Sequence, residues 1–401
     1  MNNYKINLIN HSCIKIENEK HSILIDPWFF GKVFNNSWSL IHDRGEEFID
    51  FSKLTHILIS HEHPDHLNWP TLKKIRQKKE GRIWILMGKR DNDNIKDAVI
   101  KMGFDFVYIP EDYRVKISEN LHITNYSTGH DSGQVIEIDE HKIFNQNDCR
   151  FSDQKIKYIK EKHGHFDALF YQFGLAGYYG NRGDSVAMET ARQSHVSLIR
   201  KYFKALNPGF YVPYASHVRF CKEHNDFLNR WQVTIPDLFS EIVEIPTQYL
   251  FYGSEVIFDK DKIFDRNVEN VKKWQDVIDN FPPPSEAKNI SKDKILDSCF
   301  AFSDKYEITN TTPGSLVLKF FDDQVNQVLL CNFKEKAFEF IEEEEKEMHV
   351  PISGILPAEE FLSFLKFPWG ADTLNITSCF DIIDKPSWRN MLIWKDQLYK
   401  R

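Results

Sequence analysis

The order of apolar segments in the sequence predicts an α/β protein with a mixed sheet, followed by a smaller α+β unit. Short apolar runs alternate with segments of helical periodicity over residues 57–110, which is typical of strands covered by helices. Residues 114–147 then carry successive strands joined by short turns, so the sheet is not expected to be purely parallel. With 401 residues, of which 41% are hydrophobic, the chain is long enough for two domains with packed cores.

Apolar periodicity places the individual elements. The first strands are expected at residues 4–9, 12–17 and within 21–30. Helices are expected at three places: residues 70–79, 91–103 and 185–206. Pro70 suits the first turn of the first of these helices, because the missing N–H of a proline is not needed there.

The domain boundary is expected near residues 282–284, where three consecutive prolines follow a polar helix. We therefore divide the chain into a catalytic domain, a linker and a carboxy-terminal α+β domain: residues 1–258, 259–284 and 285–401. The segment 248–258 is predicted to be a hairpin that closes the first domain.

Charge and composition exclude several classes of partner. The net charge of -8 argues against nucleic-acid binding, which needs a basic surface. No apolar run is long enough to span a membrane, and the first residues lack the profile of a signal peptide. The six cysteines have no metal-binding spacing, so they are expected to be reduced thiols in a cytoplasmic protein.

The densest group of candidate metal ligands is in the stretch ILISHEHPDHLNWPTL, residues 57–72. An apolar strand is followed within six positions by His61, His63, Asp65 and His66. Alternate residues of an extended segment share one face, so His61 and His63 can point at one atom. Asp65 and His66 follow where the chain turns and can supply a second, adjacent position. This pattern predicts a site for two divalent metal ions: zinc, manganese or iron.

Other candidate ligands stand where further strands end. His130, Asp148 and His217 each follow a predicted strand. Taken alone, His130 and Asp148 are more simply explained as turn or capping residues, but strand ends that face one sheet edge are where sites are assembled. Asp26 and His11 occupy similar junctions. Asp26 is either a carboxylate that orients a metal-bound histidine or a turn residue before Pro27, and His11 has the same two readings.

A Gly-rich loop and the segment after His217 contain side chains that suit an anionic substrate. These candidate substrate contacts are Tyr178, Arg182, Arg219 and His224. An ordinary surface turn explains Tyr178 and Arg182 as well, and Arg219 and His224 are more simply explained as solvated surface residues. The glycine spacing does not match a nucleotide-binding loop.

The ligand pattern, His61-x-His63-x-Asp65-His66 followed by His130, Asp148 and His217, resembles the metallo-β-lactamase superfamily. The resemblance implies a four-layer αββα sandwich over residues 1–258. It also implies three ligands for a first metal: His61, His63 and His130. For a second metal it implies Asp65, His66 and His217, with Asp148 bridging both. The stretches ILIDPWFFG, KIFNQNDC, FYVPYASHV and FPWGADTLNITSCFDIIDKPSW further resemble the CMP-N-acetylneuraminate hydroxylase family, and the first three also the ascorbate-phosphate lactonase and N-acylphosphatidylethanolamine phospholipase D branch.

Two functions follow from this resemblance. In the first, which the sequence favours, the protein is a hydrolase: the metal pair lowers the pKa of a bridging water, and Asp65 accepts its proton. The substrate would be a phosphate ester, a lactone or a nucleotide sugar. In the second, it is a di-iron oxygenase that takes electrons from a separate protein, because the paired Cys and His motifs of a Rieske cluster are missing from the sequence. His217 and the missing Rieske motifs favour the hydrolase. A non-catalytic binding module would be expected to lack ligands. Homo-oligomerisation is left open.

Overall fold

Two six-stranded mixed sheets form the centre of the protein. The computed structural model of the chain describes residues 4–89, 93–129, 131–259, 263–286, 288–306, 312–321, 327–343 and 351–398. The first sheet has the order β1-β2-β3-β5-β6-β7. Its strands are β1 (Lys5–Asn10), β2 (Cys13–Glu17), β3 (Ser22–Ile25), β5 (Leu54–Ile59), β6 (Trp84–Gly88) and β7 (Asp105–Ile109). The second sheet has the order β13-β12-β11-β10-β9-β8. Its strands are β8 (Arg114–Ser118), β9 (Leu121–Ser127), β10 (Ser132–Ile138), β11 (His141–Asn147), β12 (Ala168–Tyr171) and β13 (Phe210–Pro213).

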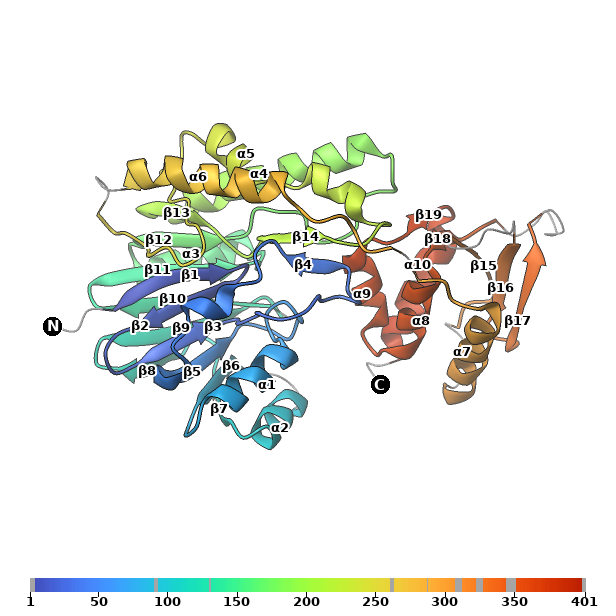
Figure 1. Cartoon of the computed structure of the whole chain (residues 1–401), viewed down its shortest axis with the longest axis horizontal. Helices are drawn as coiled ribbons and strands as arrows, with labels where there is room; N and C mark the ends of the chain where they lie inside the picture. The colour runs from blue at the N-terminus through green and yellow to red at the C-terminus, as the bar shows by residue number, and fades with distance from the viewer. Residues whose placement is uncertain are drawn as a thin grey trace.

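The two sheets pack face to face, and helices cover both outer faces (Figure 1). An apolar layer rich in isoleucine lies between them, with members such as Ile14 and Ile25 from the first sheet and Ile123 and Ile136 from the second. Helices α1 (Trp69–Lys78) and α2 (Asn94–Lys101) cover the first sheet. The second sheet is covered by α3 (Asp153–His163), α4 (Ser185–Leu206), α5 (Ile235–Glu241) and α6 (Ile263–Asp279). The predicted α/β class and αββα layering are therefore confirmed.

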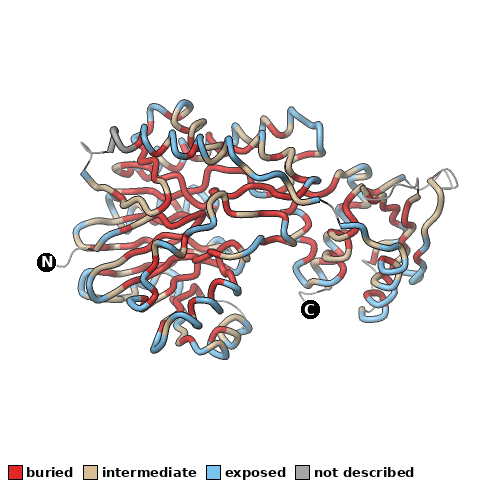
Figure 2. The backbone as a smooth tube through the Cα atoms, in the orientation of Figure 1, coloured by how far each residue is buried: buried red, intermediate tan, exposed pale blue. Residues whose placement is uncertain are grey.

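Burial follows this layering. The strands of both sheets are largely buried, whereas the outer turns of the helices are exposed (Figure 2). Helix α4 has the predicted bounds, because Asp184 caps its first turn and Asn207 ends it in the left-handed conformation. A short antiparallel pair, β4 (Trp38–Leu40) with β14 (Val218–Phe220), lies beside the main sheets.

The structure differs from the prediction at residues 248–258, which do not form a hairpin. The first arm of this segment bonds to β13 through Gln248 N and Tyr211 O, which are 2.8 Å apart. The second arm bonds to β1, where Val256 N lies 2.8 Å from Ile6 O. Each arm thus extends a different sheet, and the segment closes the sandwich along one edge.

The predicted linker, 259–284, also differs, because it contains a helix that belongs to the sandwich. Trp274 of α6 is buried, and its indole N–H donates to Leu250 O at 2.9 Å. Asn267 and Asn270 of the same helix bond to the backbone of Thr247 and Tyr249. The sandwich domain therefore extends through residue 279, and the connecting segment is short.

The remaining residues form a separate core, here called the C-terminal unit (described residues between 285 and 398). Its sheet has the order β17-β16-β15-β18-β19. The strands are β15 (Ser315–Phe320), β16 (Gln327–Asn332), β17 (Ala337–Glu342), β18 (Gly354–Leu356) and β19 (Asp381–Ile382). The helices are α7 (Lys292–Lys305), α8 (Ala358–Lys366), α9 (Gly370–Thr377) and α10 (Lys385–Gln397). All six cysteines are buried thiols, and within the described ranges no helix has the length and apolarity to cross a membrane.

Candidate metal centre

Strand topology brings the predicted ligands to one edge of the sandwich. Strands β3 and β5 are parallel, so Asp26 and the segment that begins at Ser60 leave the first sheet at the same edge. In the second sheet, β10 runs antiparallel to β11, which places the start of β10 beside Asn147, the last residue of β11. Asp131 precedes β10 and Asp148 follows β11. The two sheets therefore contribute to one cluster from residues far apart in the sequence.

One group of donor atoms in this cluster contains two imidazoles and one carboxylate. His61 Nε2 and His63 Nδ1 are 2.9 Å apart. Asp131 Oδ1 lies 3.7 Å from His61 Nε2 and 4.0 Å from His63 Nδ1. These three residues can place one ligand atom each within 4.8 Å of the others, as a bound metal ion requires.

A second group shares His61 and continues into the sandwich. Asp148 Oδ2 is 3.5 Å from His61 Nε2 and 3.5 Å from His66 Nε2. Asp65 Oδ2 lies 3.4 Å from His66 Nε2 and 3.1 Å from His11 Nε2. His11, Asp65 and His66 thus form a further group of donors, and Asp148 stands between the two ends of the cluster.

Asp26 holds His66 in the orientation that a ligand needs. Its Oδ2 lies 3.0 Å from His66 Nδ1, which leaves Nε2 facing Asp65 and Asp148. The carboxylate is itself fixed by Ser60 N at 2.7 Å, Ser60 Oγ at 2.6 Å and Asn147 Nδ2 at 2.7 Å. A carboxylate behind a ligating imidazole fixes its tautomer and raises its basicity. Asp26 thus has the geometry of a carboxylate that orients a metal-bound histidine.

The donors are buried but their carboxylates are not fully satisfied by protein groups. His61 and His66 are each 1% exposed. Asp65 Oδ1 and Asp148 Oδ1 are buried and accept no hydrogen bond from the described residues. Buried carboxylate oxygens are expensive without a partner, so this arrangement fits a bound cation. The residues present therefore fit the metal pair that the sequence implies.

The charges of the cluster act strongly on one another. Burial lowers the pKa of His61 well below its usual value. Burial would also lower the pKa of His66, but Asp65 and Asp148 raise it well above the usual range. For Asp148 the effect of burial is opposed by His61 and His66, which lower its pKa. For Asp65 as well, burial is outweighed by His66 and His11, which hold its pKa well below the usual range. Both carboxylates are therefore ionised at neutral pH, which is the form that binds a metal ion.

Two predicted ligands are not among these donors. His130 lies outside the described residues. His217 is described. Its ring stacks on that of Trp274, with 4.6 Å between the ring centres, and its Nε2 lies 3.3 Å from Pro213 O. It is buried in an aromatic setting that also includes Phe173, so its ring packs as part of the core and not with the donor groups.

Two contributions to the cluster were not predicted. Asp131 was not singled out, although it directly follows His130 in the sequence. His11 was expected only to support a ligand, but its Nε2 lies in a donor group. The only sequence signal for either was its place at a strand end.

The four predicted substrate contacts lie instead at or near the contact with the C-terminal unit. Tyr178 stacks on Phe380 at 4.6 Å, and His224 stacks on Phe321 at 4.7 Å. Arg182 donates to His224 O at 3.1 Å. Arg219 is buried and donates to the carbonyl of Pro282 in the connecting segment. Their described contacts support the arrangement of the two units.

Comparison with known proteins agrees with this fold. Residues 5–159 match the family model "Beta-lactamase superfamily domain". Cytidine monophosphate-N-acetylneuraminic acid hydroxylase of Xenopus laevis is 25% identical over 234 residues, which cover 55% of this chain and 39% of that protein. The hydroxylase of Sus scrofa is 22% identical over 227 residues, or 53% of this chain and 51% of that protein. The chain thus spans about two fifths to one half of the length of these relatives.

Two solved structures are partly similar to this chain at low sequence identity. CmlA, a diiron β-hydroxylase from Streptomyces venezuelae, is 18% identical, with a TM-score of 0.40 over 54% of this chain and 45% of that chain. A possible metal-dependent hydrolase from Veillonella parvula is 12% identical, with a TM-score of 0.45 over 64% of this chain and 99% of that chain.

Proposed function

We propose that the protein is a dinuclear metal-dependent oxygenase that hydroxylates a small anionic substrate, with iron as its metal. The observation that carries the proposal is the composition of the donor groups: His61, His63 and Asp131; His61, His66 and Asp148; His11, Asp65 and His66. Each combines two imidazoles with one carboxylate. This set, with positions left open, is typical of non-haem iron oxygenases. The relatives at 22–25% identity, which are named as hydroxylases, support the same class.

The preference for a hydrolase rested partly on His217 as a ligand. With the His217 ring stacked on Trp274, that argument no longer favours hydrolysis. Hydrolysis is kept as a second candidate because of Asp65, whose Oδ1 is buried and accepts no hydrogen bond from the described residues. Such an oxygen could take a proton from an attacking water. Catalytic zinc sites also use two histidines and a carboxylate.

When bound, the metal pair would supply either electrons for dioxygen chemistry or a Lewis acid for hydrolysis. The residues of the chain have the same tasks in both cases. His61, His63 and Asp131 would hold one ion, and His66, Asp65 and His11 the other. Asp148 lies 3.5 Å from both His61 and His66, so it would contact both ions.

The test is to purify the protein without oxygen, load it separately with iron(II), zinc(II) or manganese(II), and measure metal content by elemental analysis. The iron form is then mixed with dioxygen, and the zinc and manganese forms with phosphodiesters and lactones. About two irons per chain, with dioxygen uptake that the Asp148→Asn variant lacks, are expected. Retention of zinc in preference to iron, with ester hydrolysis, would replace the oxygenase by the hydrolase. An oxygenase would also need an electron-donor protein, which we include in the proposal.

A further inference from the structure

An exposed arginine stands two residues after Asp148 in the loop that follows β11. Consecutive Cα atoms are 3.8 Å apart, so the backbones of Arg150 and Asp148 are separated by less than about 8 Å. The long side chain of Arg150 therefore begins beside the metal centre. The direction of this side chain determines which groups its guanidinium can bind.

A buried histidine fixes this direction. Arg150 Nη2 lies 3.1 Å from Nε2 of His195, which comes from α4 and is 2% exposed. Burial first, and then the arginine charge, lower the pKa of His195 to about 4, so its ring is neutral at pH 7. A neutral imidazole with its proton on Nδ1 accepts at Nε2, and Arg150 can donate to it.

The same nitrogen is reached by the Gly-rich loop. The hydroxyl of Tyr179 lies 3.0 Å from His195 Nε2. This ring nitrogen therefore connects the loop after β11 with the loop that the sequence singled out for substrate binding. Tyr179 comes directly after Tyr178, whose ring turns to Phe380 instead.

The positive charge of Arg150 is not neutralised by the protein. Within the described ranges no carboxylate lies within 4.0 Å of its guanidinium, whereas Arg114 and Arg200 on the surface pair with Glu137 and Glu244. The other N–H groups of Arg150 make no hydrogen bond to the described residues, so donors of a planar, pre-oriented group are available.

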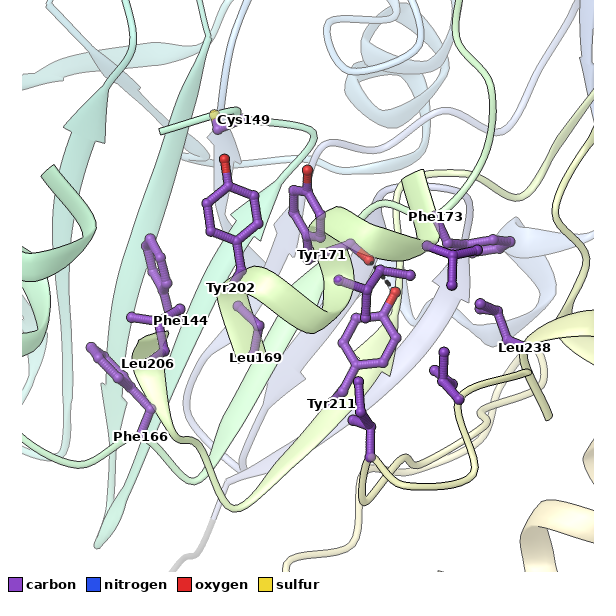
Figure 3. Packing of buried hydrophobic residues seen from close by; sticks show 14 of the residues in the cluster. Phe144, Cys149, Phe166, Leu169, Tyr171, Phe173, Tyr202, Leu206, Tyr211 and Leu238 are labelled. Atoms are coloured by element: carbon purple, nitrogen blue, oxygen red, sulfur yellow. Dashed lines mark hydrogen bonds between the residues drawn. The ribbon is translucent and has the colours of Figure 1, made fainter. Parts of the chain in front are cut away.

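The interior beneath this loop is polar on the side of the metal centre. Figure 3 shows the hydroxyls of Tyr171 and Tyr202 pointing toward the same end of the strands as Cys149. The Tyr202 hydroxyl donates to Phe151 O at 3.0 Å. The charges of both Arg150 and Asp148 act on the hydroxyl of Tyr171, which therefore lies within electrostatic reach of the arginine and of the metal ligand.

We propose that Arg150, held in place by His195 and Tyr179, binds an oxyanion of the substrate, a phosphate or a carboxylate group, beside the metal centre. The inference rests on the proposed function for the reaction that follows binding. It assigns the anionic part of the substrate to Arg150 and not to Arg182, Arg219, Tyr178 or His224. Arg150 contacts the substrate, while His195 is a positioning residue that acts through it.

The experiment titrates inorganic phosphate, and separately acetate, into the protein in its metal-free and metal-loaded forms, followed by calorimetry. The variants are Arg150→Gln, Arg150→Lys and the control Arg200→Gln, which removes a charge from α4 without touching the site. Charge-assisted hydrogen bonds to an oxyanion are strong enough that their loss should weaken binding by about tenfold or more. Arg150→Lys should retain part of the affinity, and Arg200→Gln all of it.

The role of His195 is tested in a double-mutant cycle. His195→Phe should weaken binding in the wild-type background and have no further effect when Arg150 is already Gln, because it acts only through the arginine. An additional loss of affinity in the double variant would contradict this positioning role. His195→Gln, whose side-chain oxygen can accept a hydrogen bond from Arg150, should bind more tightly than His195→Phe, and this would support the role.

The outcomes separate the inference from the proposed function. If neither probe binds to the wild type, or Arg150→Gln binds both as well as the wild type does, the oxyanion subsite is disproved even when two metals are present. If the wild type retains no metal, the proposed function fails, and the metal-free titration still decides the subsite. A preference for phosphate over acetate would indicate a phosphorylated substrate, and the reverse a carboxylate.

Discussion

Two clusters of buried charges in this protein differ in where their positive charge comes from. At the contact between the units, Lys222 Nζ lies 2.5 Å from Glu359 and 2.6 Å from Glu360. Lys222 is 5% and Glu360 1% exposed. At the sheet edge, Asp65 and Asp148 are surrounded mainly by imidazoles, and each keeps a buried oxygen that accepts no hydrogen bond from the described residues.

The difference shows which cluster is structural and which requires a ligand. A buried carboxylate is stable only with a compensating partner. In the Lys222 cluster the chain supplies that partner, and the ion pairs join the segment after β14 of the sandwich domain to α8 of the C-terminal unit. At the sheet edge no lysine or arginine of the described residues pairs with Asp65 or Asp148, so the compensating cations are expected to be bound metal ions.

The largest effect is expected from Asp148→Asn, which removes the carboxylate that lies between both ends of the donor cluster. Metal content should fall by at least one ion per chain and activity should be lost, since Asp148 Oδ2 is 3.5 Å from both His61 and His66. Elemental analysis and dioxygen uptake measure the two losses. If metal content is unchanged, Asp148 does not bridge the ions.

The complementary change is Lys222→Met, which removes the cation of the structural cluster and leaves Glu359 and Glu360 buried. Breaking such a pair costs about 3–5 kcal/mol of unfolding free energy. Because burial raises the pKa of Glu360, this carboxyl is neutralised more readily as the pH falls, and the loss should be smaller at pH 5 than at pH 8.

Denaturant unfolding measures this loss, and metal content should stay at the wild-type value. The matched control is Lys288→Met. The Lys288 side chain is 71% exposed, and its Nζ lies 3.9 Å from Glu359 Oε2. It should cost less than about 0.5 kcal/mol. Equal effects of the two variants would mean that Lys222 does not join the units.

The sequence predicted the individual helices and strands of this fold better than it predicted which strands pair with one another. Helix α4 was predicted at its observed bounds, because its caps and its apolar periodicity are local signals. Residues 248–258 were predicted as a hairpin from the same kind of signal, yet each arm bonds to a different sheet. Their partners, β1 and β13, are about 200 residues apart in the sequence, and local periodicity does not specify such a contact.

The same limit applies to the metal centre. His61, His63, Asp65 and His66 form one short segment, so their convergence could be predicted from spacing. His217 was correctly placed after a strand, but its ring packs on Trp274 of α6, a helix that was assigned to a linker. Asp131 was missed because a shift of one residue at a strand end reverses the direction of the side chain, and a sequence alone does not fix that register.

A smaller effect is expected from Asp26→Asn, which changes the support of a ligand and not a ligand itself. An amide at this position can no longer hold His66 Nδ1 as a charged acceptor, while the Ser60 contacts are kept in part. Loss of such a carboxylate typically lowers metal affinity by about 10- to 100-fold. Competition with a chelator measures the affinity. Unchanged affinity would show that Asp26 is only a turn residue.

The last effect concerns Lys395 of α10, a buried amine that lies against a backbone carbonyl and an aromatic ring. Its Nζ donates to Leu365 O at 3.0 Å and lies 4.5 Å from the centre of the Phe302 ring. Burial, followed by the charge of Lys305, lowers the pKa of Lys395 to about 7. The unfolded chain, with an ordinary lysine pKa, binds more protons between pH 7 and pH 10 than the folded one does.

Stability should therefore rise with pH across this window and be lowest below pH 7, where the buried amine is charged. Lys395→Met should remove this rise, and the exposed Lys366→Met should leave it in place, as followed by denaturant midpoints at several pH values. If the rise persists in Lys395→Met, another group causes it. If the wild type shows no rise, Lys395 remains protonated in the fold across this window.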